Sequence, residues 1–422
     1  MTKNVLRLFC EKSVYNEKLK EHTYIFAFHE DDDLVQFSNL YNLQIVEDSF
    51  FIELKSVKIE KNLGFKKSFW YEIPVDFFLE NNFIITENIE NNNQAICCCF
   101  QYISTELLIV NNYLINQDSF NRDLYYPDDT NFININYEDN NGLHINTELE
   151  EQIAKLEVLN VGVGNWNRFS YKDIEINFDF GAEMYFSEND VTKIINSNKV
   201  NANIQKRFFI LSHFDYDHYR CMLNSNFDYN RILKVYIPSK LQKTKACTKL
   251  INILSKRIGQ NKVEKLILNQ SINKKIYLEK SNRHINFGLI KAEIYKSTRC
   301  YKSNNRCLVL VLTFCNKKII FSGDIGYKYL VDMLLKYEND ESKLFLIAPH
   351  HLGKDTGFSN YISKLTLEEV FASTKSGVYS KIPQQNIHDY FNNSLNCKEF
   401  YCTDITVCNL GKNNIERVFF IY

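Results

Sequence analysis

The segment His213-Phe-Asp-Tyr-Asp-His218 decides how the rest of this sequence is interpreted. It directly follows an apolar run, residues 208–211, that is typical of a buried strand. The end of a strand is a rigid platform, and the loop beyond it can turn several polar side chains toward one point. Imidazole and carboxylate groups are ligands that suit zinc, manganese or iron. We therefore predict a metal-binding loop, against the alternative of a polar loop whose histidines only cap strands.

Two later segments repeat the arrangement of a strand followed by ligand-type residues. Residues 319–324, Ile-Ile-Phe-Ser-Gly-Asp, run from a strand into a glycine turn and Asp324, a carboxylate able to bridge two metal ions. Residues 346–351, Leu-Ile-Ala-Pro-His-His, end a further strand in His350 and His351. Each segment alone is a weak signal, because a Gly-Asp turn is usually only a turn. In this order, each at the carboxyl end of a strand, they indicate one shared site.

The order of these segments resembles the metallo-β-lactamase superfamily. The motif His213-x-Asp215-x-Asp217-His218 is similar to its H-x-H-x-D-H signature. The second ligand of the motif is aspartate, Asp215. In this the sequence resembles the branch that includes the β-lactamase-like domain of bacterial DNA-uptake (competence) proteins. Residues 158–164, 178–181 and 304–310 look like further strands and turns of that branch. The resemblance covers roughly residues 155–420 and implies a four-layer αββα sandwich.

The resemblance also implies a set of metal ligands. The implied ligands are His213, Asp215, Asp217, His218, Asp324 and His351. His213 and Asp215 would hold the first metal ion. Asp217, His218 and His351 would hold the second, and Asp324 would bridge both. The roles of His350 and His351 could be reversed.

Two residues would act on the substrate. A bridging water, acidified by two cations, would be the nucleophile near neutral pH. Asp217 would orient this water or accept its proton, and His350 would stabilise charge on the attacked centre or protonate the leaving oxygen. These two residues are the predicted catalytic groups.

The sequence departs from the pattern of the branch at several positions. Asn160, Val163 and Asn165 stand where the branch commonly has Asp, Gln and Asp. No histidine lies in residues 285–323 to complete the first metal site, and Ile382-Pro-Gln384 stands where the family often has another. We expect two divalent ions, zinc or manganese, with the first loosely held. The three carboxylates also leave open a preference for manganese or magnesium.

The length of 422 residues exceeds the usual size of one domain, so two domains are expected. The polar, Asn-rich stretch 126–151 is typical of a linker and places the boundary near residue 150. We predict domain 1–150 to be a small β-rich or α+β domain of unknown role, because it has short aromatic and β-branched runs. Domain 151–422 would be the hydrolase, and the fold class is α+β. Asp31-Asp-Asp33 is expected to be an exposed loop.

The cysteines indicate a reducing compartment. There are twelve, but no C-x-x-C pair occurs among them, so neither a disulfide framework nor a zinc knuckle is favoured. Neither a secretory leader nor an apolar stretch of membrane-spanning length is recognisable. We expect a cytoplasmic protein that does not bind a membrane.

The charge pattern leaves the partners open. The net charge is −1, so no global basic field indicates nucleic-acid binding. Residues 240–275, however, contain ten basic side chains against only Glu264: Lys240, Lys243, Lys245, Lys249, Lys256, Arg257, Lys262, Lys265, Lys274 and Lys275. This stretch is either the solvated face of a helix or a surface that follows the phosphates of a nucleic acid. A protein partner could bind the N-terminal domain.

The leading hypothesis is a binuclear metal-dependent hydrolase that cleaves a phosphodiester, as in a nuclease. One alternative is a hydrolase of a small molecule, such as a cyclic nucleotide, phosphoester, thioester or lactone. Another is a non-catalytic sensor or interaction protein with a degenerate metal site. Stand-alone proteins of this fold with an added domain also resemble effectors of bacterial anti-phage systems, an analogy of context that suggests an antiviral role.

Overall fold

The chain divides into two units by its internal contacts. The computed structural model describes residues 5–41, 43, 50–59, 64–81, 83–88, 96–104, 153–239, 242, 244–266, 277–297, 306–337, 341–353, 355, 357–378, 382–404 and 414–420. The smaller unit comprises Met1–Ile135, Tyr185–Asp190 and Gln242–Lys249, and the larger unit comprises the remainder. The predicted linker and boundary near residue 150 lie outside the described residues, so they stay predictions.

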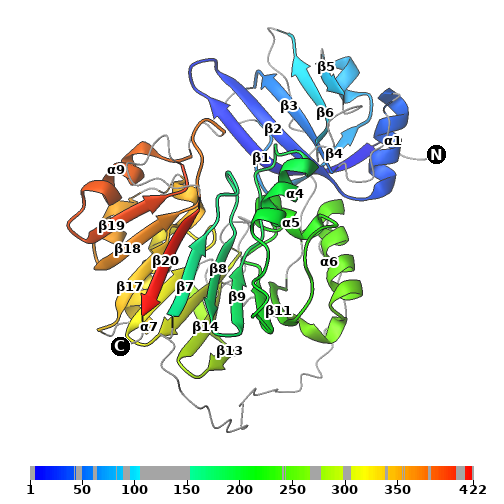
Figure 1. Ribbon diagram of the computed structural model, residues 1–422. Coiled ribbons are helices and arrows are strands. Elements are labelled where there is room, and N and C mark those ends of the chain that lie inside the picture. The colour runs from blue at the N-terminus through cyan, green and yellow to red at the C-terminus, as the bar shows by residue number, and fades with distance from the viewer. Residues whose placement is uncertain are drawn as a thin grey trace. The chain divides into compact units, whose positions relative to one another are not determined.

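The smaller unit contains one six-stranded sheet with helices on one face (Figure 1). The strand order is β4-β1-β2-β3-β6-β5. The strands are β1 (Val5–Asn16), β2 (Glu21–Phe28), β3 (Phe51–Val57), β4 (Trp70–Pro74), β5 (Phe83–Asn88) and β6 (Ile96–Tyr102), and the helices are α1 (Asp31–Tyr41) and α2 (Phe77–Glu80). Aromatic rings fill its core, among them Phe78 and Phe100, stacked with centroids 4.7 Å apart.

The larger unit contains two seven-stranded sheets. The first has the order β12-β11-β10-β9-β8-β7-β20 and the second β13-β14-β15-β16-β17-β18-β19. The first sheet consists of β7 (Ile153–Val158), β8 (Asn167–Tyr171), β9 (Ile174–Phe178), β10 (Lys206–Ile210), β11 (Ile232–Pro238), β12 (Val263–Leu266) and β20 (Ile415–Phe420). The second consists of β13 (Leu278–Phe287), β14 (Ile290–Ser297), β15 (Leu308–Phe314), β16 (Lys317–Phe321), β17 (Lys343–Ile347), β18 (Leu367–Ala372) and β19 (Cys397–Cys402).

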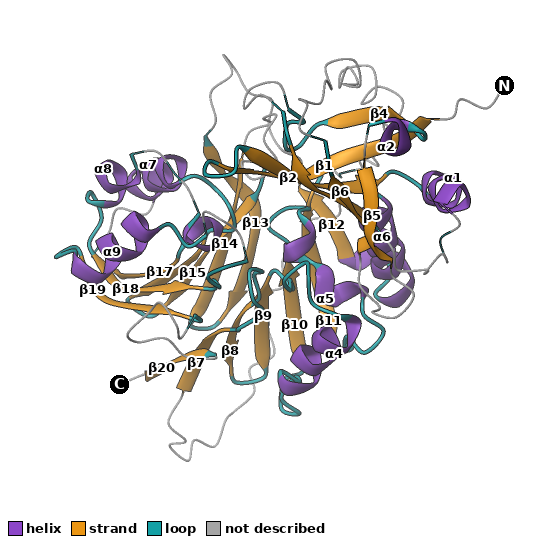
Figure 2. Cartoon of the chain, turned by 90° about the horizontal axis from the view of Figure 1, so that it is seen from above, coloured by secondary structure: helices purple, strands orange, loops and turns teal. Residues whose placement is uncertain are grey.

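Helices cover the outer side of each sheet (Figure 2). Near the first sheet are α4 (Glu188–Ser197), α5 (Arg220–Leu223), α6 (Lys245–Arg257) and the 3-10 turns η1 (Tyr216–His218) and η2 (Gln260–Lys262). Near the second are α7 (Tyr327–Tyr337), α8 (Phe358–Ile362), α9 (Gln385–Asn393) and the 3-10 turn η5 (Pro349–Leu352). Apolar side chains of α7, α8 and α9 pack with the outer face of β15–β19 in one buried cluster.

A second cluster fills the space between the two sheets. Phe208 and Ile210 of β10 lie in it with Leu310 and Phe345 of the other sheet. Phe209, whose side chain points to the opposite face, instead packs its ring 4.2 Å from that of Phe180. This period-two alternation is why the run 208–211 is apolar throughout, since both faces of the strand are covered. The predicted four-layer αββα arrangement and α+β class are confirmed.

The strands expected before the metal loop, the Gly-Asp turn and the paired histidines are present as β10, β16 and β17. One prediction for the smaller unit is wrong. Asp31, Asp32 and Asp33 do not form a loop but the first turn of α1. Carboxylates are favourable there because the first helical turn carries partial positive charge, and Asp33 accepts hydrogen bonds from the backbone N–H groups of Arg7 and Glu30. The prediction failed because an acidic cluster suits both a loop and a helix start.

The cysteines of the described residues are free thiols. All are buried except Cys315. This use as small apolar core residues agrees with the prediction of no disulfide framework. Among the described helices, none combines the length and apolar character needed to cross a bilayer.

A buried ion pair anchors the strand that leads to the metal loop. Arg207 of β10 and Glu175 of β9 are each 2% exposed, with Nε 3.0 Å from Oε1. The Arg207 guanidinium also donates to the carbonyl of Asp228 at 2.7 Å. Removing one partner leaves an uncompensated buried charge.

We predict that Arg207→Ala lowers the free energy of unfolding by about 3–5 kcal/mol. The exposed pair of Lys398 and Glu368 supplies the control, because Lys398→Ala should cost at most about 1 kcal/mol. Urea unfolding followed by circular dichroism measures both. Equal stability of the two variants would contradict the role given to Arg207.

Candidate metal centre

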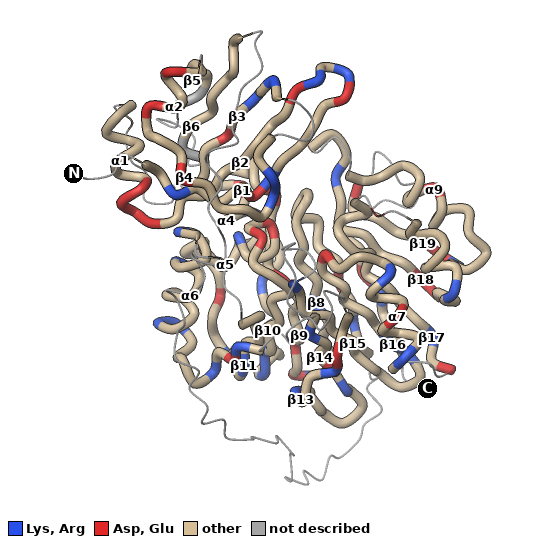
Figure 3. The backbone as a smooth tube through the Cα atoms, turned by 180° about the vertical axis from the view of Figure 1, so that it is seen from behind, with Lys and Arg blue, Asp and Glu red and all other residues tan. Residues whose placement is uncertain are grey.

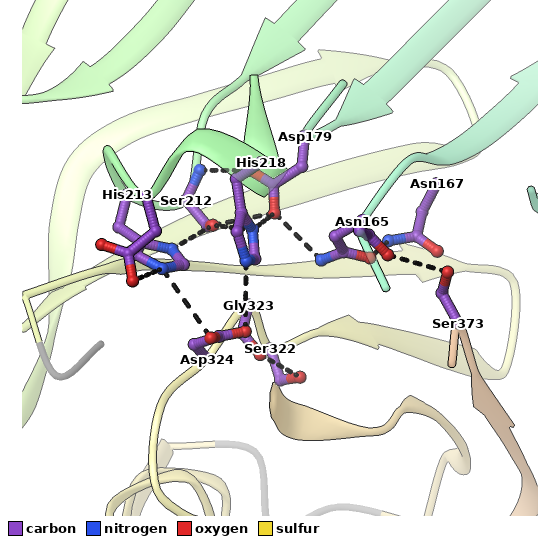
Figure 4. A network of polar contacts seen from close by, with 12 residues as sticks. Asn165, Asn167, Asp179, Ser212, His213, His218, Ser322, Gly323, Asp324 and Ser373 are labelled. Atoms are coloured by element: carbon purple, nitrogen blue, oxygen red, sulfur yellow. Dashed lines mark hydrogen bonds and ion pairs between the residues drawn. The ribbon is translucent and has the colours of Figure 1, made fainter. Parts of the chain in front are cut away.

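Ligand-type side chains from three strand ends lie close together in the larger unit, and Figure 4 shows those of His213, His218 and Asp324. His213 and His218 follow β10, Asp324 follows β16, and His351 follows β17. Nε2 of His218 lies 3.3 Å from Oδ1 of Asp324, and Nε2 of His351 lies 3.8 Å from the same oxygen. Nε2 of His213 lies 3.8 Å from the other carboxylate oxygen, Oδ2.

These side chains form two overlapping groups able to hold metal ions. One group is His213, His218 and Asp324, and the other is Asp217, His218 and His351, with ligand atoms within 4.8 Å of one another in each. Ligands about 2.0–2.2 Å from a tetrahedral ion stand about 3.3–3.6 Å apart. The observed separations of 3.3–3.8 Å around Asp324 are close to that spacing. Asp215 lies outside both groups, with Oδ2 3.6 Å from Nε2 of His213.

The histidines are oriented by the hydrogen bonds of their Nδ1 atoms. His351 Nδ1 lies 2.9 Å from the carbonyl of Ser373, which can only accept, so Nδ1 carries the proton. His218 Nδ1 lies 2.8 Å from the Asp179 carboxylate, which is likewise an acceptor. His213 Nδ1 lies 2.9 Å from the hydroxyl of Ser212, which itself donates to Asp179. A metal-bound histidine is neutral, and with Nδ1 protonated in each ring the atom that would bind a metal ion is Nε2.

The Nε2 atoms provide a direct test of whether metal ions fit. Nε2 of His213, His218 and His351 is buried in each case and makes no hydrogen bond of good geometry to any described residue, although that of His218 lies within ion-pair distance of Asp324. Buried polar atoms are nearly always satisfied, so three such atoms converging on carboxylates need an explanation. A metal ion supplies it, because it would accept all three lone pairs. The residues present therefore fit a metal centre.

Asp179 holds the loop in place. It follows β9 and is fully buried. Its Oδ1 accepts the backbone N–H of Ser212 at 2.6 Å, and its Oδ2 accepts the Ser212 hydroxyl at 2.8 Å. Oδ2 also accepts from the Asn165 amide at 2.9 Å. Asparagine at 165 departs from the branch pattern, yet here it is suitable, because an aspartate could not donate this hydrogen bond.

Two glycines allow the close approach of backbone segments around the loop. A Cβ on Gly181 would lie 1.6 Å from the carbonyl oxygen of Asp217, so only glycine fits beneath the loop. A Cβ on Gly323, at φ +56°, would lie 2.8 Å from Cβ of Ser212. Together these positions let Asp324 and Asp217 approach the same centre.

The paired histidines lie on a left-handed turn. His350 and His351 both have φ of 52°, and Leu352 has φ of 62°. Such values cost on the order of 1–3 kcal/mol for residues other than glycine and cluster at functional sites. The turn directs the buried His351 into the centre, while His350, with its side chain 34% exposed, lies at the edge with Nε2 3.8 Å from Asp324. The Nε2 atoms of the two histidines lie equally far from Asp324, so which of them would bind metal stays a prediction.

The charges of the centre favour a cation. Burial acts to raise the pKa of Asp324, but the neighbouring His350 and His218 rings outweigh it and hold that pKa well below its usual range. Burial acts to lower the pKa of His218, but the Asp324 and Asp179 carboxylates outweigh it and raise that pKa well above its usual value. Burial lowers the pKa of His351. Asp324 is therefore anionic at neutral pH.

The positions of these groups along the chain decide the fold assignment. The metal loop, the Gly-Asp turn and the paired histidines follow β10, β16 and β17 of a four-layer sandwich, in the predicted order. The larger unit has the metallo-β-lactamase fold. The closer resemblance to DNA-uptake proteins stays a prediction.

Comparisons with known proteins were made by sequence and by structure. No family model matches the chain, and no curated protein matches it. Similar solved structures include the metallo-β-lactamase fold protein YhfI from Bacillus subtilis, at 11% identity over 64% of this chain and 100% of that chain, with a TM-score of 0.39. A diphosphatase from the PhnP family is 12% identical over 64% and 98%, with a TM-score of 0.35. A long form RNase Z from yeast is 14% identical over 80% of this chain and 49% of that chain, with a TM-score of 0.31.

The structure brings all the predicted site residues to one place, and their roles stay predictions. The prediction did not assign a role to Ser212, Asp179 or Ser373, which orient the histidine rings. Asp179 had a visible signal, since it is an acidic residue at a strand end before a glycine. Ser373 had none, because its contact with His351 depends on the fold. Within the interval 285–323, where the family often has a further ligand to the first metal, residues 298–305 lie outside the described residues.

We predict that Asp179→Asn weakens metal binding by about 10–100-fold, because the neutral amide no longer accepts from both Ser212 and His218. Asp173→Asn is the matched control, since Asp173 is a half-exposed residue in the turn before β9. Calorimetric titration of metal-free protein with Zn²⁺ or Mn²⁺ measures both affinities. Equal affinity of Asp179→Asn and wild type would show that Asp179 does not hold the loop.

Proposed function

We propose that the larger unit is a binuclear metal-dependent hydrolase that cleaves phosphodiesters. The observation that carries this proposal is the convergence of three unsatisfied Nε2 atoms, from His213, His218 and His351, on the Asp324 carboxylate. A purely structural cluster would pair these nitrogen atoms with acceptors or donors of the protein. The degenerate-site alternative is disfavoured by the same observation.

The charge of the centre favours an anionic substrate. Three carboxylates, those of Asp215, Asp217 and Asp324, surround the site, and each is buried. Two divalent cations held among these carboxylates would coordinate the oxygens of an anionic substrate directly. A phosphodiester carries one negative charge, so it is complementary to the loaded centre. A neutral ester or lactone lacks this attraction.

Asp217 and His350 supply the proton transfers. When bound, two divalent ions would provide a hydroxide near neutral pH and stabilise charge on the phosphoryl oxygens. Asp217 lies in the loop with its carboxylate near His218 and His351, where it can orient a water or accept its proton. His350 is accessible at the edge of the centre, where it can protonate the leaving oxygen.

A nucleic-acid substrate would use basic residues near the first sheet, and Figure 3 shows Lys and Arg positions along α6 and beside β11. Of the ten basic residues in 240–275, four lie outside the described residues. Lys262 is engaged, because its ammonium donates to the Ile232 carbonyl at 2.9 Å. Lys256, Arg257 and Lys265 are exposed, which supports a limited electrostatic surface rather than an extended one. Their binding to nucleic acid is part of the proposal.

A hydrolysis panel tests the proposed function. Protein loaded with Mn²⁺ or Zn²⁺ is incubated with single- and double-stranded DNA, with RNA and with bis(p-nitrophenyl) phosphate. We expect cleavage of at least one phosphodiester, reduced by about 10²–10⁴-fold in Asp217→Asn. The Asp173→Asn variant, with the same chemical change outside the centre, should keep wild-type activity.

Two outcomes would contradict the proposal. Cleavage by Asp217→Asn at the wild-type rate would exclude the role of this loop. Hydrolysis of a thioester or lactone without hydrolysis of any phosphodiester would favour the small-molecule alternative.

A further inference from the structure

We propose that Gly353 is a positioning residue, which fixes the imidazole ring of His350 at the edge of the metal centre so that this ring can protonate the leaving oxygen. The inference rests on the proposed function, in which His350 has that role. Gly353 directly follows the 3-10 turn η5, two residues beyond His351. Three features support the assignment: the backbone conformation of Gly353, its contact with the ring and the anchoring of the turn.

The backbone conformation of Gly353 does not require a glycine. Its φ is −69° and its ψ is 170°, an extended conformation that any residue adopts. Gly323 and Gly357, in contrast, lie at positive φ, where other residues are strained. The reason for a glycine at position 353 therefore lies in what surrounds its α-carbon.

The α-carbon of Gly353 packs against the ring of His350. A Cβ at position 353 would lie 3.0 Å from Cγ and 3.0 Å from Nδ1 of His350, and 2.7 Å from its carbonyl oxygen. Favourable contacts between carbon atoms are longer, about 3.5–4.0 Å. Cγ and Nδ1 thus form the edge of the ring that faces Gly353, and Nε2 lies across the ring, 3.8 Å from Oδ2 of Asp324. A larger residue at 353 would occupy the space that this orientation of the ring needs.

The turn that carries the ring is anchored along its length. The His350 N–H donates to the carbonyl of Gly323 at 3.1 Å, and the Gly353 N–H donates to the carbonyl of His350. The Leu352 carbonyl accepts the N–H of Gln384 at 2.8 Å. Because these hydrogen bonds hold the backbone, the side chain of His350 is the part that yields most readily to an added Cβ.

His350 is placed to act on a bound substrate. Its side chain is 34% exposed, whereas that of Asp324 is 6% exposed and that of His351 is 4% exposed. As hydroxide forms the new bond to phosphorus, the bond to the leaving oxygen breaks and the proton on Nε2 of His350 passes to that oxygen. Such a transfer needs a distance of about 2.6–3.2 Å, and a misplacement of about 1 Å costs about 10²-fold in rate. The orientation that Gly353 imposes therefore bears directly on the rate.

Gly353→Ala tests the assignment in the metal-loaded full chain with two phosphodiesters. Diphenyl phosphate has the more basic leaving oxygen and gains from its protonation, whereas the p-nitrophenolate that leaves bis(p-nitrophenyl) phosphate is stable without a proton. We expect kcat to fall about 10–100-fold for diphenyl phosphate and less than about threefold for bis(p-nitrophenyl) phosphate. The content of bound metal should match that of wild type.

Gly288→Ala is the matched control. Gly288 lies in the turn between β13 and β14 at φ +55°, and a Cβ there would meet nothing within 4 Å. The substitution strains the backbone without touching His350, so it controls for a loss of stability. It should keep wild-type kcat for both phosphodiesters.

Two further measurements separate positioning of the ring from a purely structural role. In a His350→Ala background, Gly353→Ala should not lower kcat for diphenyl phosphate any further, because the ring through which Gly353 acts is gone. Crystal structures of metal-loaded wild type and Gly353→Ala should show the His350 ring displaced in the variant, with His351 and Asp324 in place.

The outcomes distinguish this inference from the proposed function. Equal losses for the two phosphodiesters, additive effects of the two substitutions, loss of bound metal or an unmoved His350 ring in the variant would each overturn the inference. If wild type cleaves no phosphodiester, the proposed function fails. The crystal structures then decide whether Gly353 positions the ring.

Discussion

The hydrogen bonds of the buried Asp179 carboxylate are the interaction on which the metal centre depends. A carboxylate offers about four lone-pair sites, and this one accepts from Ser212 twice, from His218 and from Asn165. One side chain therefore joins the end of β9 to the start of the metal loop and to the opening turn. It also sets the tautomer of His218, and through the Ser212 hydroxyl that of His213. The Nε2 atoms then point into the centre before any ion binds, which lowers the reorganisation needed for binding.

The sequence reveals those features of the metal centre whose residues lie close together along the chain. The loop from His213 to His218 places four ligand-type residues within six positions after an apolar strand, and Asp324 and His351 follow strands of the same kind. Asp324 and His351 follow β16 and β17, which are parallel neighbours in the second sheet, so these two residues lie at one edge of that sheet. The loop from His213 to His218 follows β10 of the first sheet, so it joins them only through the packing of the two sheets. The layered fold could also be predicted from local sequence, because a strand that is covered on both faces is apolar along its whole length.

The rest depends on contacts between residues far apart in the chain. Ser373 reaches His351 across 22 residues and Gly164 across 209, and Lys375 reaches Glu183 across 192. No local pattern marks a serine that acquires its role through such a contact. The hairpin of β13 and β14 was missed for a different reason: β13 is mostly polar, with Lys280, Asn282, His284 and Asn286 exposed, so its apolar alternation is weak. The acidic start of α1 shows that a local pattern can also fit two different structures. Asp31 to Asp33 suit a loop and the first turn of a helix equally well.

The central claim is that the side chains around Asp324 form a binuclear metal centre. Its most direct test is the metal content of the purified protein, measured by plasma mass spectrometry after equilibration with Zn²⁺ or Mn²⁺ and removal of free ions. The account predicts about two ions per chain, with loss of metal in His218→Ala, because His218 belongs to both ligand groups. A protein that binds no ion, or binds equally well without His218, would contradict the account.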